Sequence, residues 1–133
     1  MSDGPPEVKR ALVAGHADFA AGLLSAVEII SGRGGVLVPI RVTGLCGGDI
    51  EALLKRTLEE HGVRVIFTDL QAGSCTMAAR RVQREVGGVV LVAGANLPML
   101  LDFVLSREQD VAVAAANAAE KGRGSVSVFG GPA

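Results

Sequence analysis

Short apolar runs and longer amphipathic segments alternate along this chain. The apolar runs have the length of buried strands and cover residues 8–14, 36–42, 63–68, 88–93 and 125–129. Between them, apolar side chains recur at helical spacing in residues 17–31, 49–61, 74–85, 98–105 and 108–121. Asp49 is predicted to cap the start of the second helix, and Gly32 and Gly62 are predicted to end the first and second.

This alternation predicts an α/β domain with a mainly parallel sheet that is covered by helices on both faces. Four parallel strands with short connections favour a doubly wound order of the flavodoxin-like kind. Pro39 indicates that the second strand lies at an edge of the sheet, because proline has no backbone N–H to donate. Ligands of such folds bind at the carboxyl ends of the strands, in the crevice between the first and third strands.

The length of the chain fits one domain. It has 133 residues, of which 49% are hydrophobic, so it can bury a core. Residues 1–7 lack the features of a targeting segment and are expected to form a disordered tail, which leaves 8–133 as a single domain. Residues 86–105 carry a single charge, but Asn96 and Pro98 interrupt them. We therefore expect a strand, a turn and a helix there, and not a membrane span.

Charge and cysteine usage exclude several classes of function. The formal net charge is −1, the basic residues are scattered, and there is no Trp or Tyr on which a base could stack, so nucleic-acid binding is not indicated. Cys46 and Cys75 match no metal-ligand or redox spacing and are expected to be reduced thiols in a cytoplasmic protein.

The candidate chemistry gathers at the predicted carboxyl ends of the strands. The first strand runs into Gly15 and His16, the third ends at Asp69, and a short loop leads from Asp69 to Ser74 at the start of a helix. A carboxylate that accepts a hydrogen bond from one ring nitrogen of a histidine leaves the other nitrogen free as a nucleophile. Helix N-termini and a serine hydroxyl can hold a phosphoryl group, and transfer between histidines requires no metal or cofactor.

Structural roles are the alternatives for each of these residues. His16 could be an ordinary loop or capping residue, Asp69 could form an Asx turn, and Ser74 could be the N-cap of the third helix. Their common position around one predicted crevice favours the functional interpretation.

Three blocks of the sequence, at residues 12–20, 67–74 and 92–100, resemble segments of the mannose-family enzyme IIA domains of the bacterial sugar phosphotransferase system. The first is Leu12-Val-Ala-Gly-His-Ala-Asp-Phe-Ala20, with the glycine–histidine pair that follows an apolar strand in that family. The second, Phe67-Thr-Asp-Leu-Gln-Ala-Gly-Ser74, resembles the Asp-x-x-Gly-Gly-Ser loop. The third, Val92-Ala-Gly-Ala-Asn-Leu-Pro-Met-Leu100, resembles the segment Gly-x-Asn-x-Pro-Met-Leu. Their order and spacing fit over residues 9–128.

The resemblance implies a phosphocarrier. His16 would accept a phosphoryl group from phospho-HPr and pass it to a IIB component, and thereby indirectly serve a membrane sugar permease. Asp69 would orient His16, and Ser74, Gly73 and Ala72 would line the phosphoryl pocket.

The resemblance also implies strand order 2-1-3-4 and a homodimer. Residues 125–129 would form an antiparallel edge strand that the two subunits exchange, and the helix at residues 98–105 would face the partner.

Two departures from the family pattern affect the pocket. Ala72 replaces the first glycine of the Gly-Gly-Ser loop and adds a methyl group where the backbone approaches the phosphate. Ala17 and Asp18 follow the histidine where many members have glycine or small polar residues, and Asp18 adds a negative charge beside an incoming phosphoryl group.

Three other functions remain as alternatives. The phosphotransfer subunit of a dihydroxyacetone kinase shares the fold and the histidine, but its loop is typically shorter than the spacing from Asp69 to Ser74. A signalling receiver domain needs an acidic Mg²⁺-binding pair after the first strand, where this chain has Gly15 and His16. A flavin- or nucleotide-binding module would need aromatic or extended glycine-rich contacts that are absent from the sequence.

Overall fold

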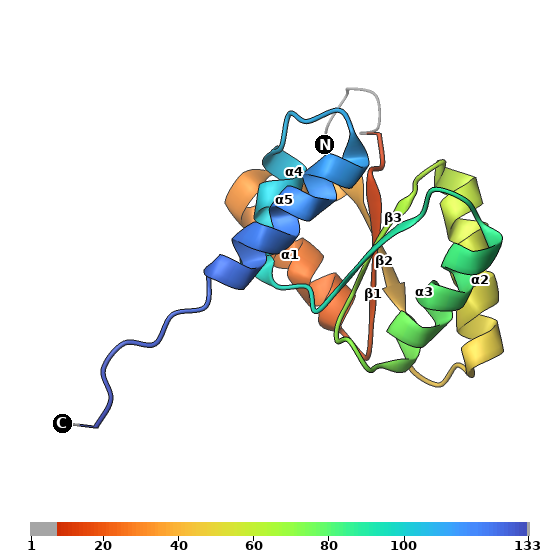
Figure 1. The fold of residues 1–133 in the computed structure, drawn as a ribbon, viewed down its shortest axis with the longest axis horizontal. Helices are drawn as coiled ribbons and strands as arrows, with labels where there is room; N and C mark the ends of the chain where they lie inside the picture. Colours follow the sequence, from red (N-terminus) through yellow and green to blue (C-terminus); the bar gives the residue numbers. More distant parts are fainter. Residues whose placement is uncertain (1–7, 133) are drawn as a thin grey trace.

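The computed structural model describes residues 8–132, so the expected disordered tail at residues 1–7 lies outside the described residues. Four strands alternate with helices along the chain (Figure 1). The strands are β1 (Ala11–Gly15), β2 (Leu37–Arg41), β3 (Val65–Thr68) and β4 (Val90–Ala93). The helices are α1 (Phe19–Ser31), a 3₁₀ turn η1 (Gly34–Val36), α2 (Gly47–His61), α3 (Ser74–Glu85), α4 (Leu97–Leu105) and α5 (Val111–Gly124).

The four strands form one parallel sheet in the order β2-β1-β3-β4. β1 is central and pairs with β2 and β3, for example Leu12 with Val38 and with Ile66. The α/β class, the parallel sheet and the order 2-1-3-4 expected from the sequence are thus confirmed. Pro39 lies on the edge strand β2, as its missing N–H requires.

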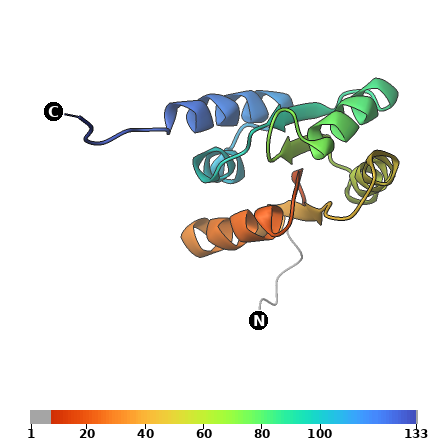
Figure 2. The same ribbon diagram turned by 90° about the horizontal axis from the view of Figure 1, so that it is seen from below.

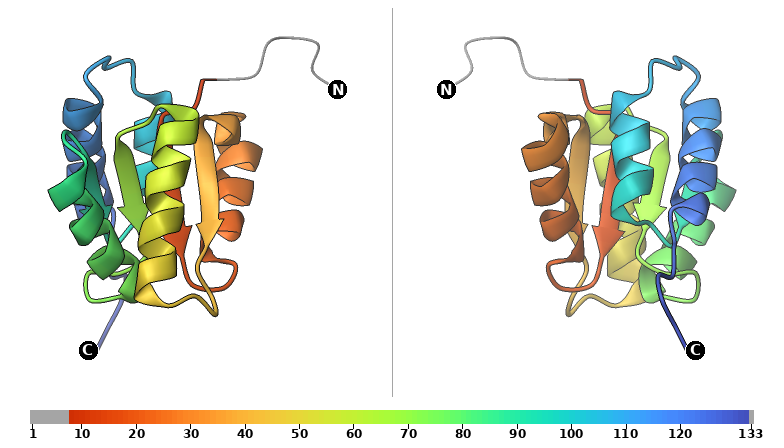
Figure 3. Two further views of the ribbon diagram at one scale, coloured as in Figure 1. Left: turned by 90° about the vertical axis from the view of Figure 1, so that its right-hand side faces the viewer. Right: turned by 90° about the vertical axis from the view of Figure 1, so that its left-hand side faces the viewer.

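Helices cover both faces of the sheet (Figures 1 and 3). One core packs α1, α4 and α5 on one face, and the other packs α2 and α3 on the opposite face. Successive side chains of a strand point to opposite faces of the sheet, so β1 contributes to both cores. Its residues Ala11 and Val13 belong to the first core, and Leu12 and Ala14 belong to the second. This alternation with a period of two residues holds β1 in place and fixes where its carboxyl end lies.

The helix ends agree with the sequence in part. Gly32 and Gly62 have left-handed backbones and end α1 and α2, as predicted. α3 has the predicted bounds. The N-cap of α2 is Cys46, however, and Asp49 lies inside the first turn, so the Asp49 prediction is wrong. The helix starts earlier because Gly47 and Gly48 also adopt helical geometry.

α4 and α5 pack closely over the end of β4. Asn96 caps α4 by accepting a hydrogen bond from the backbone N–H of Met99, and its amide donates to the carbonyl of Gly122. A Cβ atom on Gly122 would lie 2.8 Å from Met99, so the two helices approach at a distance that only glycine allows. The apolar stretch at residues 86–105 contains the strand β4 and the helix α4. No helix of the described chain is long and apolar enough to span a membrane.

The prediction of an antiparallel strand at residues 125–129 is wrong for the single chain. These residues leave the end of α5 as an extended tail that projects away from the sheet (Figures 1 and 2). Within the described residues, no backbone hydrogen bond reaches residues 126–132. The pattern Val126-Ser-Val-Phe129 is that of a strand, but the direction in which α5 ends carries it away from the edge of its own sheet.

Candidate functional site

His16 and Asp69 meet at the carboxyl edge of the sheet. His16 directly follows β1, and Asp69 directly follows β3, the strand beside it. The ring Nδ1 of His16 lies 2.6 Å from Oδ2 of Asp69. The backbone N–H of His16 donates to the same oxygen at 2.9 Å. The structure therefore brings together the two residues that the sequence placed at the switch between the first and third strands.

This geometry determines which ring nitrogen is free. An ionised carboxylate only accepts hydrogen bonds, so Nδ1 carries the proton and donates it to Asp69. Nε2 then presents its lone pair. The side chain of His16 is 54% exposed, whereas that of Asp69 is 8% exposed. A buried carboxylate thus holds the ring of an accessible histidine.

The carboxylate of Asp69 is itself held in place. Burial alone raises the pKa of this carboxyl, but the hydrogen bonds from the ring and backbone of His16 outweigh burial and bring the pKa below its ordinary value. Its other oxygen, Oδ1, accepts from the backbone N–H of Leu70 at 3.0 Å. Asp69 is therefore ionised at neutral pH, as orientation of the histidine requires.

Gly15 is the residue that allows β1 and Asp69 to approach each other. A Cβ atom at this position would lie 2.7 Å from the ring of Phe19 and 3.1 Å from Oδ2 of Asp69. Any larger residue would displace the carboxylate from the backbone N–H of His16.

The loop after Asp69 brings the remaining predicted residues to the same edge. Gly73 is buried and is the N-cap of α3, so the alternative that Ser74 is the N-cap is wrong. Ser74 is the first residue of the helix and is exposed, and its hydroxyl bonds to no other described residue. Ala72 is also exposed. The hydroxyl of Ser74 and the first N–H groups of α3 are thus available to an anion.

A threonine pair that the sequence analysis missed supports this loop. Thr76 Oγ1 donates to the carbonyl of Leu70 at 2.5 Å and lies 2.6 Å from Oγ1 of Thr68. Because the proton of Thr76 is used on Leu70, the hydroxyl of Thr68 donates to Thr76. Both threonines are buried. The only signal in the sequence is two threonines among apolar neighbours, which does not reveal that they bond to each other.

Cys75 lies beside the site but is not a nucleophile. Burial raises the pKa of its thiol to about 12, and the negative charge of Asp69 adds to the shift. The thiol is protonated at neutral pH and packs in the core with α2. No group of three metal-ligating side chains occurs among residues 8–132.

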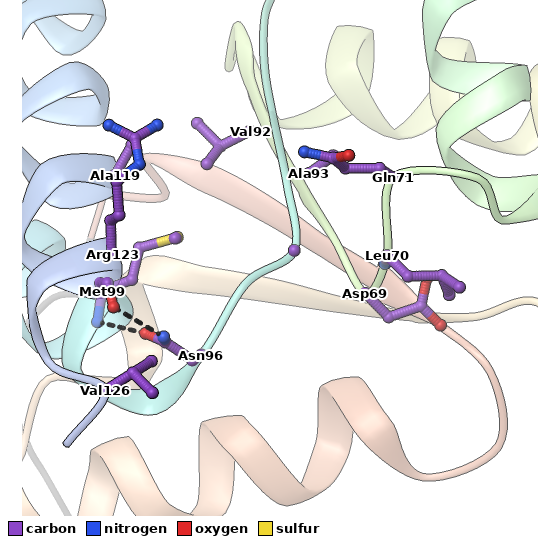
Figure 4. A pocket seen from close by; sticks show the side chains of 12 residues that line it. Asp69, Leu70, Gln71, Val92, Ala93, Asn96, Met99, Ala119, Arg123 and Val126 are labelled. Carbon is purple, nitrogen blue, oxygen red and sulfur yellow. Dashed lines mark hydrogen bonds between the residues drawn. The ribbon is translucent and has the colours of Figure 1, made fainter. Parts of the chain in front are cut away.

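A cavity of about 520 Å³ opens next to Asp69, between the end of β4 and the last turn of α5 (Figure 4). Gln71, Asn96, Arg123 and Val126 contribute to its lining, and His16 does not. The cavity therefore extends along the β4 side of the site, where the C-terminal segment begins.

These features define a class of protein: a parallel α/β domain that presents an oriented histidine at the carboxyl edge of its sheet. A comparison with protein families finds a match to the PTS system fructose IIA component over residues 10–120. The chain belongs to this family, the mannose-family enzyme IIA proteins, and is a phosphotransfer component of sugar uptake; the family implies HPr and a IIB component as partners.

Solved structures of the same kind have a similar fold. The mannose/sorbose-specific IIA subunit of the phosphotransferase system from Enterococcus faecalis is 23% identical, with a TM-score of 0.78 over 96% of this chain and 98% of that one. The IIA protein associated with the fucose utilization operon of Streptococcus pneumoniae is 22% identical, with a TM-score of 0.77 over 90% and 92%. The phosphotransferase component EIIA from Streptococcus agalactiae is 24% identical, with a TM-score of 0.72 over 89% and 95%. No curated protein matches the chain.

Proposed function

We propose that Nε2 of His16 is the atom that accepts a phosphoryl group from phospho-HPr and passes it to the IIB component. The observation that carries this proposal is the hydrogen bond of 2.6 Å between Nδ1 and Asp69, which fixes the ring and, in its neutral form, places the proton on Nδ1 and the lone pair on Nε2 at an exposed edge. Asp69 is in this proposal the residue that orients His16.

The transfer step follows from this arrangement. The lone pair of Nε2 forms a bond to phosphorus as the bond to the donor nitrogen of HPr breaks, and that electron pair returns to the donor. The ring of His16 becomes positively charged, and the negative charge of Asp69 stabilises it across the hydrogen bond. The reverse sequence passes the phosphoryl group on to the IIB component. Catalysis consists of positioning and charge stabilisation, and neither step needs a metal.

The start of α3 is proposed to bind the phosphoryl oxygens. The positive end of the helix and the unpaired N–H groups of its first turn favour an anion there. The hydroxyl of Ser74 is an additional donor, while Gly73 and Ala72 bring the backbone to the same edge. Ala72 is exposed, so its methyl group leaves this loop accessible.

The surface around His16 fits a protein partner. Leu45 follows β2, Leu70 follows Asp69, and Met77 lies in the first turn of α3. All three side chains are exposed although they are large and apolar. Apolar side chains around a reactive group are typical of a surface on which another protein docks. HPr and the IIB component would bind to this surface one after the other.

The test is to locate the phosphoryl group. The chain is incubated with phosphoenolpyruvate, enzyme I and HPr, and the modified peptide is identified by mass spectrometry at high pH. We expect one adduct, on His16, that is stable to base and labile to acid, as a phosphohistidine is. His61, the other histidine of the chain, is the internal comparison and should remain unmodified. A base-labile adduct on Asp69, or none at all, would show that the proposal is wrong.

We propose further that the protein is a homodimer in which residues 125–129 add to the sheet of the second chain. β4 is an edge strand whose residues are only half-buried. The tail carries Val126, Val128 and Phe129, which are 76%, 88% and 93% exposed in the single chain. An open strand edge and an unpaired apolar strand segment in the same molecule complement each other.

Truncation after Gly124 is expected to convert the dimer into a monomer, because it removes the exchanged segment and leaves the described helices and strands complete. The mass in solution is measured by light scattering after gel filtration. A matched control that ends at Phe129 retains the segment and should keep the mass of the full chain. If the chain that ends at Gly124 has the same mass as the full chain, residues 125–129 do not hold the dimer together.

A further inference from the structure

The residue after His16 has an unfavourable backbone conformation. Ala17 has a φ of +46°, and it is the one residue other than glycine in the described chain with a positive φ. A side chain in this left-handed region brings Cβ close to the backbone, so the conformation persists only where surrounding contacts maintain it. Such residues concentrate at functional sites. Ala17 lies in the short segment that joins the proposed acceptor His16 to α1.

A side chain from the segment after β2 forms a hydrogen bond with this residue. The backbone N–H of Ala17 donates to Oγ1 of Thr43 at 2.7 Å. Thr43 reaches it because β2 lies beside β1 in register, with Arg41 opposite Gly15, and the N–H of Val42 continues the pairing to the carbonyl of Gly15. The chain after β2 therefore runs alongside the chain after β1.

The His16 loop is thus held from both neighbouring strands. On the β3 side, Asp69 accepts from the backbone N–H and from the ring of His16. On the β2 side, Thr43 accepts from Ala17, and Arg41 forms an ion pair with Asp18. One oxygen of Asp69 can serve both the N–H and the ring of the same residue only in a narrow range of backbone angles around His16. The contact with Thr43 lies one residue further along and restrains those angles.

We propose that Thr43 is a positioning residue for phosphoryl transfer: its hydroxyl holds Ala17 in the left-handed conformation that keeps the ring of His16 on Asp69. This inference rests on the proposed function of His16. Without the hydroxyl, residue 17 relaxes towards negative φ, the ring leaves the carboxylate in part of the molecules, and the proton is no longer confined to Nδ1. The fraction of chains with an aligned, unprotonated Nε2 falls, so kcat falls while the docking surface is unchanged.

The first test compares Thr43→Val, Thr43→Ser and Thr57→Val in the transfer of phosphate from phospho-HPr. Thr57→Val is a matched control because its hydroxyl bonds to the carbonyl of Leu53 within α2, away from the site. Loss of one hydrogen bond is expected to lower kcat of Thr43→Val about five- to tenfold, with KM for HPr unchanged. Thr43→Ser retains the hydroxyl and should recover the wild-type kcat, as should Thr57→Val. A wild-type kcat for Thr43→Val would overturn the proposal.

The second test removes the need for the hydrogen bond. Glycine adopts the left-handed conformation without a steric penalty, so Thr43→Val should change kcat less than about twofold in an Ala17→Gly background. If the loss in kcat is as large in that background as in the wild type, Thr43 acts in some other way and the proposal is wrong.

A third measurement needs no partner protein. The ¹⁵N shifts of the His16 ring report which nitrogen carries the proton, and Thr43→Val should move them towards a mixture of the two tautomers. Wild-type shifts in Thr43→Val would contradict the positioning role. The outcomes also separate this inference from the proposed function. If the wild-type chain is never phosphorylated on His16, the proposed function is wrong. If the wild-type chain and the Thr43→Val variant are phosphorylated equally fast on His16, only the positioning role of Thr43 is wrong.

Discussion

The variant His16→Ala is expected to take up no phosphoryl group from phospho-HPr, while its fold is unchanged. The imidazole is the proposed nucleophile, and the neighbouring thiol of Cys75 cannot replace Nε2 because it is buried and protonated. The fold should persist because the ring is exposed and the backbone N–H of residue 16 still reaches Asp69. Radiolabel from phosphoenolpyruvate measures the uptake, and circular dichroism measures the fold.

The control for this prediction is His61→Ala. His61 is the last residue of α2, remote in the fold from the carboxyl edge at which β1 ends, and this variant should be labelled like the wild type. If His16→Ala still acquires an acid-labile label, or if His61→Ala loses it, His16 is not the acceptor.

The variant Asp69→Asn is expected to lower the rate of transfer by up to about 10⁴-fold, the loss found when the carboxylate that orients the catalytic histidine of a serine protease is made neutral. An amide that turns its NH₂ group towards Nδ1 holds the proton on Nε2, the wrong nitrogen for attack. The substitution also removes the negative charge of Asp69, which stabilises the phosphorylated ring of His16. Single-turnover transfer from phospho-HPr measures the effect. Asp49→Asn, in the first turn of α2, is the control and should be unaffected.

The same pair predicts how stability depends on pH. The pKa of Asp69 is lower in the folded chain than in the unfolded one, so its ionised form stabilises the fold above the unfolded value, about 4. This contribution is lost as the pH falls through the folded pKa. Between pH 7 and acid pH, the free energy of unfolding should therefore decrease less in Asp69→Asn than in the wild type. An equal decrease in both proteins would mean that the pairing with His16 contributes nothing to the fold.

The sequence predicted the parts of the site that depend on local pattern. Short apolar runs identify β1 and β3, and the ends of adjacent parallel strands lie together, which is why His16 and Asp69 could be paired without coordinates. Glycine after a helical segment likewise predicted the ends of α1 and α2, because few residues other than glycine adopt a left-handed cap.

The parts that could not be predicted depend on contacts across the fold or between chains. The hydroxyl of Thr43 bonds to a residue 26 positions earlier, and nothing in its neighbours shows this. The strand pattern at Val126 to Phe129 was recognised, but a pattern does not reveal whether the strand that completes it belongs to the same chain.

Pro39 has a consequence for how far such chains can assemble. The N–H of Val42 points towards β1, and N–H groups alternate along a strand, so position 39 faces outward from the sheet. Proline removes the donor that an additional strand would need on that side. Addition of a further strand is therefore less favourable at β2 than at the other edge, β4. In the proposed dimer, the exchange pairs β4 of both chains at once, so two chains form a closed pair in which no β4 is left free for a third chain.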